Sequence, residues 1–338
     1  DIPGLQDFGG ATIHPQFWPE GFDYAGKRIV VVGSGATAVS LVPALAEQAA
    51  QVTMLQRTPT WYLIRPTRDR LANLIFRLLP ARWAHRLNRG KNALFQHLFI
   101  ARSRARPEAV KKFLHERLAE ELGPDFSRAD FTPPYDPWNQ RMCLVPDGDL
   151  FKAMKAGKAE VVTGTIERVD KAGVVLSDGR RLDADAIVTA TGLRLAMLGK
   201  IAVSLDGTPV DFSQRFYYRN CMFSNVPNLA ALFGYLSAGW TLRVDLVAAW
   251  LCRLFEQMDR WDVDVATPYL PEDHGLEEAD VFGLFSSGYL QRGKHLVPRS
   301  ATEAPWRISM NYLNDRTEMR DAPIDDGHLR FEKARTPA

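Results

Sequence analysis

The sequence predicts an α/β fold with two domains, the first of which is interrupted by a helical insertion. Three observations favour it: a strand–helix–strand pattern around a glycine motif at residues 33–38, a long basic helical stretch after it, and strand-like sequence that returns later. The length of 338 residues agrees, because a domain takes about 150 residues. Hydrophobic residues at 46% and charged residues at 24% exclude a disordered chain.

The first strand–helix–strand unit lies near the N-terminus. Residues 27–32 (KRIVVV) form a short β-branched run, which is typical of a buried parallel strand. Residues 37–48 have helix-like sequence, and residues 52–55 form a second strand. Together they make a βαβ unit of about 30 residues.

Further elements are expected downstream. Strand-like sequence covers 160–169, 173–182 and 185–189, and Asp178-Gly179 indicates a hairpin turn. The Pro- and aromatic-rich segment 131–149 is expected to be an ordered loop. A helix is expected from about residue 242 to residue 258.

The stretch 65–117 carries fourteen Lys and Arg against three Asp and Glu, a local net charge of +11 in a chain whose total is +2. Its apolar residues recur at helical spacing, which predicts two or three amphipathic helices with breaks at Pro80 and Gly90. Such a stretch could bind an anionic partner, either a phosphate-rich cofactor or, weakly, a membrane surface. The alternative is a helical excursion with a solvated basic face.

Cysteine content and uncharged runs indicate the cellular compartment of the chain and whether it spans a membrane. Three cysteines lie too far apart for a disulfide framework or a zinc cluster, which indicates a reducing compartment and no metal site. The opening DIPGLQDFGG has no signal-peptide features, and the uncharged runs at 29–46 and 220–242 are interrupted by Gly, Pro or Asn. We expect a cytoplasmic protein without a membrane span and without a nucleic-acid partner.

The glycine motif is Gly33-Ser34-Gly35-Ala36-Thr37-Ala38, which reads G-x-G-x-x-A directly after a strand and at the start of a helix. Gly33 allows the tight turn, Gly35 lets the backbone approach a pyrophosphate, and Ala38 lets the helix pack closely on the strand. The helix N-terminus presents unpaired N–H groups to the phosphates. The motif therefore predicts a Rossmann-like, three-layer dinucleotide-binding domain.

The end of the second strand distinguishes the possible cofactors. A site for NAD, or for the adenosine of FAD, places Asp or Glu about 20 residues beyond the glycines to hold the ribose 2′-hydroxyl. This chain has Gln56-Arg57-Thr58-Pro59 instead. A guanidinium binds a 2′-phosphate, whereas a carboxylate repels it, so Arg57 with Thr58 predicts NADPH. The alternative is that Arg57 is an ordinary surface arginine.

Several common catalytic patterns are absent from the sequence. It has no Tyr followed four residues later by Lys, no C-x-x-C, no H-E-x-x-H and no G-x-S-x-G. An NADPH-binding chain without its own acid–base motif must pass the hydride to another acceptor, most simply a flavin.

Residues 8–19 read F-x-G-x-x-x-H-x-x-x-W-P, shortly before the glycine motif. This segment resembles the fingerprint of Baeyer–Villiger monooxygenases, within the flavin-containing monooxygenase family. The resemblance extends to segments that are similar to the ethionamide-activating subgroup, at 134–141, 147–151, 190–193, 239–242 and 305–307. Without the rest of the fingerprint, His14 would be interpreted as a structural histidine in a linker, with no catalytic role.

The resemblance implies roles for individual residues. It places Arg141 beside the flavin as a catalytic residue and groups His14 with it, although a structural tie to a loop carbonyl is the alternative for Arg141. It assigns the NADPH 2′-phosphate to Arg57 and to Gln140, a position that is often Lys in the wider family. Thr191, Gly192 and Trp240 are the remaining cofactor-binding residues that it implies.

The resemblance also implies the reaction and the substrates. NADPH reduces bound FAD, and the reduced flavin combines with O2 to give a C4a-peroxyflavin. This species attacks a ketone to give an ester, or oxidises sulfur or nitrogen in substrates such as sulfides and thioamides. Arg141 suits the reaction because its permanent cation stabilises developing oxygen charge.

One departure from the family pattern is large. Family members carry an FAD-binding βαβ unit with its own glycine motif before the fingerprint, whereas this sequence has one such motif, after the fingerprint. The alternative function is therefore a truncated, non-catalytic NADP(H)-binding fragment. The expected domains are a linker with the fingerprint (1–22), an NADPH domain (23–62 and 138–194), a helical insertion (63–137) and the C-terminal part of an FAD and substrate domain (195–338).

Overall fold

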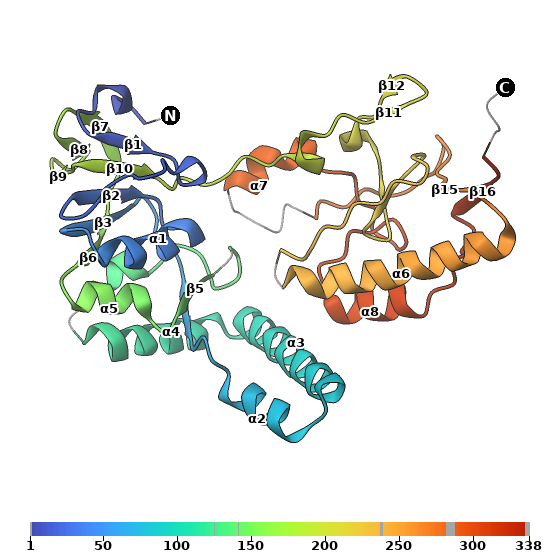
Figure 1. Ribbon diagram of the computed structural model, residues 1–338, viewed down its shortest axis with the longest axis horizontal. Coiled ribbons are helices and arrows are strands. Elements are labelled where there is room, and N and C mark those ends of the chain that lie inside the picture. Colours follow the sequence, from blue (N-terminus) through green and yellow to red (C-terminus); the bar gives the residue numbers. More distant parts are fainter. Residues whose placement is uncertain (1, 125, 141, 237–238, 282–287, 335–338) are drawn as a thin grey trace. The chain divides into compact units, whose positions relative to one another are not determined.

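The computed structural model describes residues 2–124, 126–140, 142–236, 239–281 and 288–334 (Figure 1). The chain forms two compact units, Asp1–Leu193 and Arg194–Ala338, each with its own hydrophobic core. The first unit combines a parallel sheet with helices, so the expected α/β class is confirmed.

A five-stranded parallel sheet forms the centre of the first unit. Its strands, in spatial order, are β1 (Ala11–Ile13), β10 (Ala186–Thr189), β2 (Arg28–Val32), β3 (Gln51–Gln56) and β6 (Ala159–Thr163). Every neighbouring pair runs parallel. Three of these strands, β2, β3 and β10, confirm those expected from the short apolar runs.

Two further layers cover this sheet. Helices α1 (Ala36–Ala46) and α5 (Asp149–Lys155) lie on one face, and the antiparallel strands β7 (Ile166–Asp170), β8 (Gly173–Leu176) and β9 (Arg181–Asp183) lie on the other (Figure 1). In β2, Ile29 and Val31 join the helix-side core, whereas Val30 and Val32 join the core on the β7–β9 side. Because side chains alternate along a strand, an all-apolar strand suits a sheet that is buried on both faces. The expected three-layer, Rossmann-like arrangement is confirmed.

Two expected elements differ from the structure. The single strand expected at 160–169 is wrong, because β6 ends at Thr163 and β7 begins at Ile166 in a different sheet. Gly164 lies between them, where a Cβ would come within 2.8 Å of the Leu176 side chain. The loop expected at 131–149 is also wrong in part, because it contains β5 (Cys143–Pro146), which pairs in parallel with β4 (Tyr62–Arg65). The hairpin at Asp178-Gly179 is confirmed between β8 and β9.

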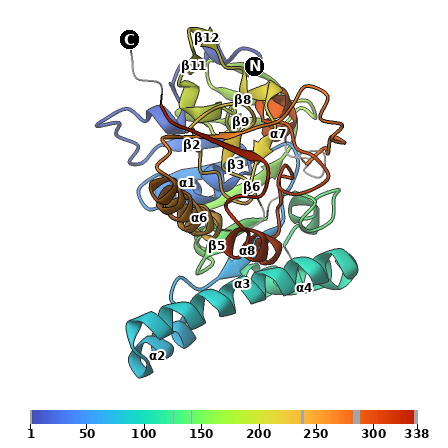
Figure 2. The same ribbon diagram turned by 90° about the vertical axis from the view of Figure 1, so that its right-hand side faces the viewer.

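Three helices, α2 (Arg70–Leu78), α3 (Ala81–Ala105) and α4 (Pro107–Leu122), form the insertion. Figure 2 shows α2 and α3 on the side of the unit away from the parallel sheet. The boundary at Pro80 is confirmed, but the break expected at Gly90 is wrong, because Gly90 lies inside the unbroken 25-residue helix α3. A glycine inside a helix costs only about 1 kcal/mol, and good helix formers on either side outweigh that cost.

The second unit is built around α6 (Trp240–Trp261), which packs against α8 (Tyr312–Arg320). The helix expected at 242–258 is thereby confirmed. Arg243 of α6 and Asp315 of α8 form a fully buried ion pair at 3.1 Å. The remaining elements are α7 (Gly288–Gly293) and the antiparallel pairs β11 (Ser204–Leu205) with β12 (Thr208–Pro209), β13 (Tyr217–Tyr218) with β14 (Met222–Phe223), and β15 (Val265–Pro268) with β16 (Leu329–Glu332). In the part of the chain that the structure describes, no helix is long and apolar enough to cross a membrane.

Candidate dinucleotide-binding site

Four loops that follow parallel strands carry most of the expected site residues. His14 follows β1, Gly33 follows β2, Arg57 follows β3, and Thr191 comes two residues after β10. The carboxyl ends of parallel strands lie along one edge of a sheet, and ligands of open α/β sheets bind outside that edge. The fold therefore gathers these loops at one edge of the sheet.

Gly33 makes the turn from β2 towards α1 in a conformation that favours glycine, with φ of 132°. Its N–H donates to the Leu55 carbonyl at 2.8 Å, which ties the turn to β3. A Cβ on residue 33 would lie 2.2 Å from the carbonyl oxygen of Ala190, in the loop after β10. The expected tight turn is therefore present, and it requires glycine for two independent reasons.

Gly35 lies at the N-terminus of α1 and leaves space in front of the helix. It is the N-cap residue, and no side chain caps the first N–H groups of the helix. A Cβ on Gly35 would meet no atom within 4 Å, so its surroundings are open. The first turn contains Ala36, Thr37 and Ala38, of which Ala38 is fully buried in the core. An uncapped helix N-terminus with open space before it suits a phosphate group.

Ser34 joins the glycine turn to the loop after β3. Its Oγ donates to the carbonyl oxygen of Thr58 at 3.1 Å. The Cys143 thiol approaches the Ser34 carbonyl oxygen at 3.7 Å from β5. These contacts fix the glycine turn relative to the loop that carries Arg57.

Arg57 has an exposed side chain, and among the described residues it makes no hydrogen bond or ion pair. The residue before it, Gln56, is fully buried, and its Nε2 donates to the Asp130 carbonyl at 2.6 Å and to the Thr163 hydroxyl at 2.9 Å. The strand end is thus held firmly while the guanidinium of the next residue stays available. An available guanidinium at this edge is what a 2′-phosphate site needs.

His14 lines a cavity of about 390 Å³ at the same edge. The cavity is also lined by Thr37 of α1 and Gly192 of the loop after β10, together with Pro15, Gln16, Thr189, Ala190 and Leu193. His14 Nδ1 accepts a hydrogen bond from the Gln16 N–H at 3.2 Å, so a neutral ring carries its proton on Nε2. The structure therefore brings the fingerprint, the glycine motif and the Ala190-Thr191-Gly192 loop to one cavity.

Of the expected site residues that the structure describes, His14, Thr37 and Gly192 line this cavity. Gln140 and Trp240 also lie outside the four loops that follow the parallel strands. Gln140 ends the turn that starts at Pro137, and Trp240 begins α6 in the second unit, where its ring lies 4.9 Å from that of Phe233. Arg141 lies outside the described residues. Sequence reasoning also missed Thr189, whose hydroxyl donates to the Ile13 carbonyl at 3.3 Å and which lines the cavity. Its position directly before Ala190-Thr191-Gly192 was the available signal.

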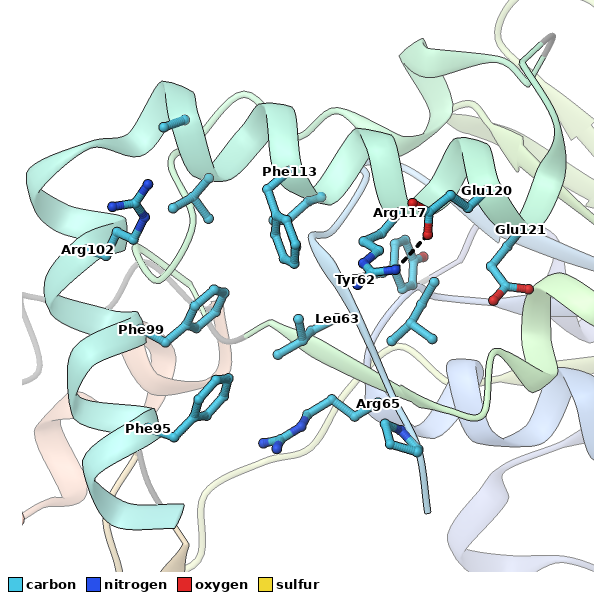
Figure 3. Close-up of a pocket in the computed structure, with 15 residues that line it drawn as sticks. Tyr62, Leu63, Arg65, Phe95, Phe99, Arg102, Phe113, Arg117, Glu120 and Glu121 are labelled. Carbon is cyan, nitrogen blue, oxygen red and sulfur yellow. Dashed lines mark hydrogen bonds and ion pairs between the residues drawn. The ribbon is translucent and has the colours of Figure 1, made fainter. Parts of the chain in front are cut away.

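A second cavity, of about 510 Å³, lies between β4, α3 and α4 in the insertion (Figure 3). The rings of Phe95 and Phe99 are stacked along α3 with centroids 6.1 Å apart, and the Arg65 guanidinium lies 4.7 Å from the Phe95 centroid. Arg117 pairs with Glu120 at 2.7 Å on the α4 side. None of the expected site residues that the structure describes lines this cavity, so it is separate from the candidate dinucleotide site.

Comparison with known proteins agrees with these motifs. Residues 1–200 match the family described as Flavin-binding monooxygenase-like. The chain is 44% identical over 336 residues to the FAD-containing monooxygenase EthA of Mycobacterium tuberculosis. The aligned part covers 99% of this chain and 68% of that protein. It is 42% identical over 334 residues to the "Probable FAD-binding monooxygenase AlmA" of Acinetobacter baylyi. This alignment covers 98% of this chain and 67% of that protein.

Solved structures show the same fold. Cyclohexanone monooxygenase with bound cyclohexanone has a TM-score of 0.67 at 21% identity, over 98% of this chain and 72% of that one. Steroid monooxygenase bound to NADP has a TM-score of 0.66 at 18% identity, over 99% of this chain and 72% of that one. The resemblance seen in residues 8–19 is confirmed. The chain belongs to the flavin-binding monooxygenase-like family.

Proposed function

We propose that this chain works in an FAD- and NADPH-dependent monooxygenase, which transfers one oxygen atom from O2 to a ketone or oxidises sulfur or nitrogen. The observation that carries the proposal is the open glycine turn before α1, at the same sheet edge as the exposed Arg57, which has no ion-pair partner among the described residues. Family membership supports the reaction class.

NADPH fits the residues at this edge. Its pyrophosphate would lie at the N-terminus of α1, where Gly35 leaves open space and no side chain caps the helix. Its 2′-phosphate would pair with Arg57, assisted by Thr58 and by Gln140. A guanidinium offers two parallel donors to phosphate oxygens, which accounts for a preference over NADH.

FAD is proposed because of the family and not because of a second glycine turn that could hold its pyrophosphate. The described residues form one glycine turn of this kind, and we assign Thr191, Gly192 and Trp240 to cofactor contacts on the strength of the motifs that contain them. When bound, FAD would accept hydride from NADPH and activate O2.

The catalytic roles rest on two residues. Arg141 would hold a permanent positive charge next to the oxygen atoms on which negative charge develops. His14 would position the cavity that the fingerprint and the glycine turn share, because its Nδ1 holds the backbone of the following 3-10 turn while Nε2–H remains a donor.

The wider assignments are part of the same proposal. We assign residues 1–22 to a linker, 23–62 and 138–194 to the NADPH domain, 63–137 to the insertion, and 195–338 to the FAD and substrate side. A ketone, a sulfide or a thioamide would be the substrate, and the cytoplasm the location. The low cysteine content supports that location.

Product analysis tests the proposal. The flavin-loaded protein is incubated with NADPH, O2 and either cyclohexanone or methyl phenyl sulfide, and the expected products are caprolactone and the sulfoxide. The Arg141→Ala variant is expected to oxidise NADPH through the flavin but to release no oxygenated product. Full product formation by this variant would remove Arg141 from the chemistry.

A second candidate function is NADP(H) binding without turnover. It is favoured by the single glycine motif in the 338 residues. The absorption spectrum of the purified chain separates the two functions. A colourless protein whose melting temperature rises with NADPH supports binding alone, whereas flavin absorbance bands support the oxygenase.

A further inference from the structure

The outer helices of the insertion expose an unusual amount of apolar surface. None of the residues of α2 is buried, and α3 buries only Ala84, Asn88 and Ser103 out of 25 residues. A helix at the surface of a globular protein normally turns its apolar side towards the core. Here Phe99 of α3 packs on a core of the unit, but several other large apolar side chains of the two helices are exposed.

Four of the exposed large apolar residues of α3 lie along one line. Trp83, Leu87, Leu94 and Leu98 are 59%, 52%, 54% and 57% exposed. At about 100° per residue, these four positions fall within roughly 60° of the helix circumference. We call them the apolar stripe.

Helix α2 continues the same pattern. Leu71, Leu74 and Leu78 are 53%, 50% and 72% exposed, and they stand at i, i+3 and i+7, which is one helix face. Helix α2 packs against α3, so both exposed faces belong to one helical hairpin (Figure 2).

The charge beside the apolar stripe selects its partner. Residues 65–117 carry fourteen basic and three acidic side chains. Arg82 and Arg86 lie near the start of the stripe, and the Arg86 guanidinium is 5.5 Å from the Trp83 ring centroid. Exposed Leu and Trp flanked by arginines match an anionic bilayer surface, in which the apolar side chains enter the acyl boundary and the cations meet the headgroups.

We propose that the apolar stripe of α3, with the exposed face of α2, docks this protein on an anionic lipid bilayer. Each helix would lie in the plane of the interface, because its exposed leucines share one face. Docking is reversible and depends on ionic strength, since the arginines act through a screened surface potential. This inference does not rest on the proposed oxygenase activity.

Vesicle co-sedimentation tests the proposal with the full chain. Binding is measured to vesicles of phosphatidylcholine with 30% phosphatidylglycerol and to vesicles of phosphatidylcholine alone. Preferential binding to the anionic vesicles is expected, with a loss of at least tenfold between 0.05 and 0.5 M salt. Absence of binding to the anionic vesicles at low salt would overturn the proposal.

Matched variants distinguish binding through the apolar stripe from nonspecific adsorption to the vesicles. Leu87→Gln with Leu94→Gln is expected to weaken binding at least tenfold, and Arg82→Gln with Arg86→Gln about tenfold. The control is Phe255→Gln with Arg260→Gln on α6, which removes the same kinds of exposed side chain and should leave binding unchanged. Equal binding by the Leu87/Leu94 variant and the wild type would contradict the proposal.

Two further readouts exclude other occupants of the stripe. Brominated lipids in the anionic vesicles should quench part of the tryptophan fluorescence, and Trp83→Phe should abolish that part. If the stripe instead joined two copies, size-exclusion chromatography would show a dimer that the Leu87/Leu94 variant converts to a monomer. If another part of the chain covered it, the same variant would melt several degrees lower. Either result would overturn membrane docking.

Discussion

Gly33 and Ala190 approach each other so closely that a Cβ on residue 33 would lie 2.2 Å from the Ala190 carbonyl oxygen, whereas a Cβ on Gly35 would meet nothing within 4 Å. The two glycines of this motif therefore meet different structural requirements. Gly33 serves the fold, because it lets the turn pass the loop after β10. In the proposed site Gly35 would serve the dinucleotide, because it leaves the front of α1 open.

The first prediction follows from this contrast. Gly33→Ala should lower the free energy of unfolding by about 2–4 kcal/mol, since φ of 132° and the clash both oppose a side chain. Gly35→Ala should cost about 1 kcal/mol or less, because alanine is a poorer N-cap than glycine, but it should weaken NADPH binding at least tenfold. Urea denaturation and a fluorescence titration with NADPH measure the two effects. Equal destabilisation by both substitutions would contradict the division of roles.

The second prediction concerns Arg57, the exposed residue directly after β3. Arg57→Ala should raise the Kd for NADPH at least tenfold and that for NADH less than twofold, because only NADPH carries the 2′-phosphate. Arg57→Lys should give an intermediate Kd for NADPH, since it keeps the charge and loses the bidentate geometry. Parallel titrations with both nucleotides provide the measurement, and equal losses for NADPH and NADH would refute the assignment.

The third prediction concerns the core of the second unit. Asp315 accepts from Arg243 at 3.1 Å and from the Tyr235 hydroxyl at 2.5 Å, and both partners of the ion pair are fully buried. Asp315→Ala should destabilise the protein by about 3–5 kcal/mol, because it leaves an uncompensated buried charge. The matched change Glu256→Ala removes an exposed pair with Arg260 at 3.8 Å and should cost less than about 1 kcal/mol. Similar urea midpoints for the two variants would argue against the buried pair.

The fourth prediction concerns acid pH. Two hydrogen bonds from Arg181 lower the pKa of Asp170 to about 2, below the ordinary value near 4. The interaction therefore contributes stability above pH 4 and loses it as the pH falls towards 2. The melting temperature of Arg181→Gln should lie below that of the wild type at pH 5–7, and the difference should close between about pH 4 and pH 2. A difference that stays constant down to pH 2 would exclude this linkage.

The fifth prediction separates the cysteines. Cys221 is fully buried, and burial raises the pKa of its thiol to about 12, whereas Cys252 is exposed on α6. Cys143 is buried as well. Dithionitrobenzoate at pH 8 should label one thiol per native chain and all three after denaturation. The Cys252→Ser variant should lose the native reaction, and an unchanged labelling rate in that variant would show that another thiol is accessible.

Sequence reasoning succeeded where the signal was local. The β-branched run of β2, the glycine motif and the apolar run of β10 each specify a short element and its edge of the sheet without information from elsewhere. The placement of the glycine turn followed from these local patterns, because parallel strands end on one side.

Sequence reasoning failed where distant residues decide the outcome. Gly164, directly after β6, lies so close to the Leu176 side chain of β8 that a Cβ would come within 2.8 Å of it, and β5 is stabilised by its pairing with β4. The buried pair of Arg243 with Asp315 joins two helices that no spacing rule connects. The second cavity is likewise assembled from β4, α3 and α4, whose periodicity indicated amphipathic helices but not their mutual packing.

The parallel pairing of β4 with β5 limits how the insertion can change. Tyr62 lies opposite Cys143 and Arg65 opposite Pro146, so the chain enters the insertion at one end of this ladder and must return to the other end before β5 begins. A tight turn cannot make that return, since parallel strands need a crossover connection of about a dozen residues or more. The outer helices could be shortened or exchanged, but some crossing segment has to remain. Variation in length and surface can thus accumulate in the insertion while the nucleotide edge of the sheet keeps its shape.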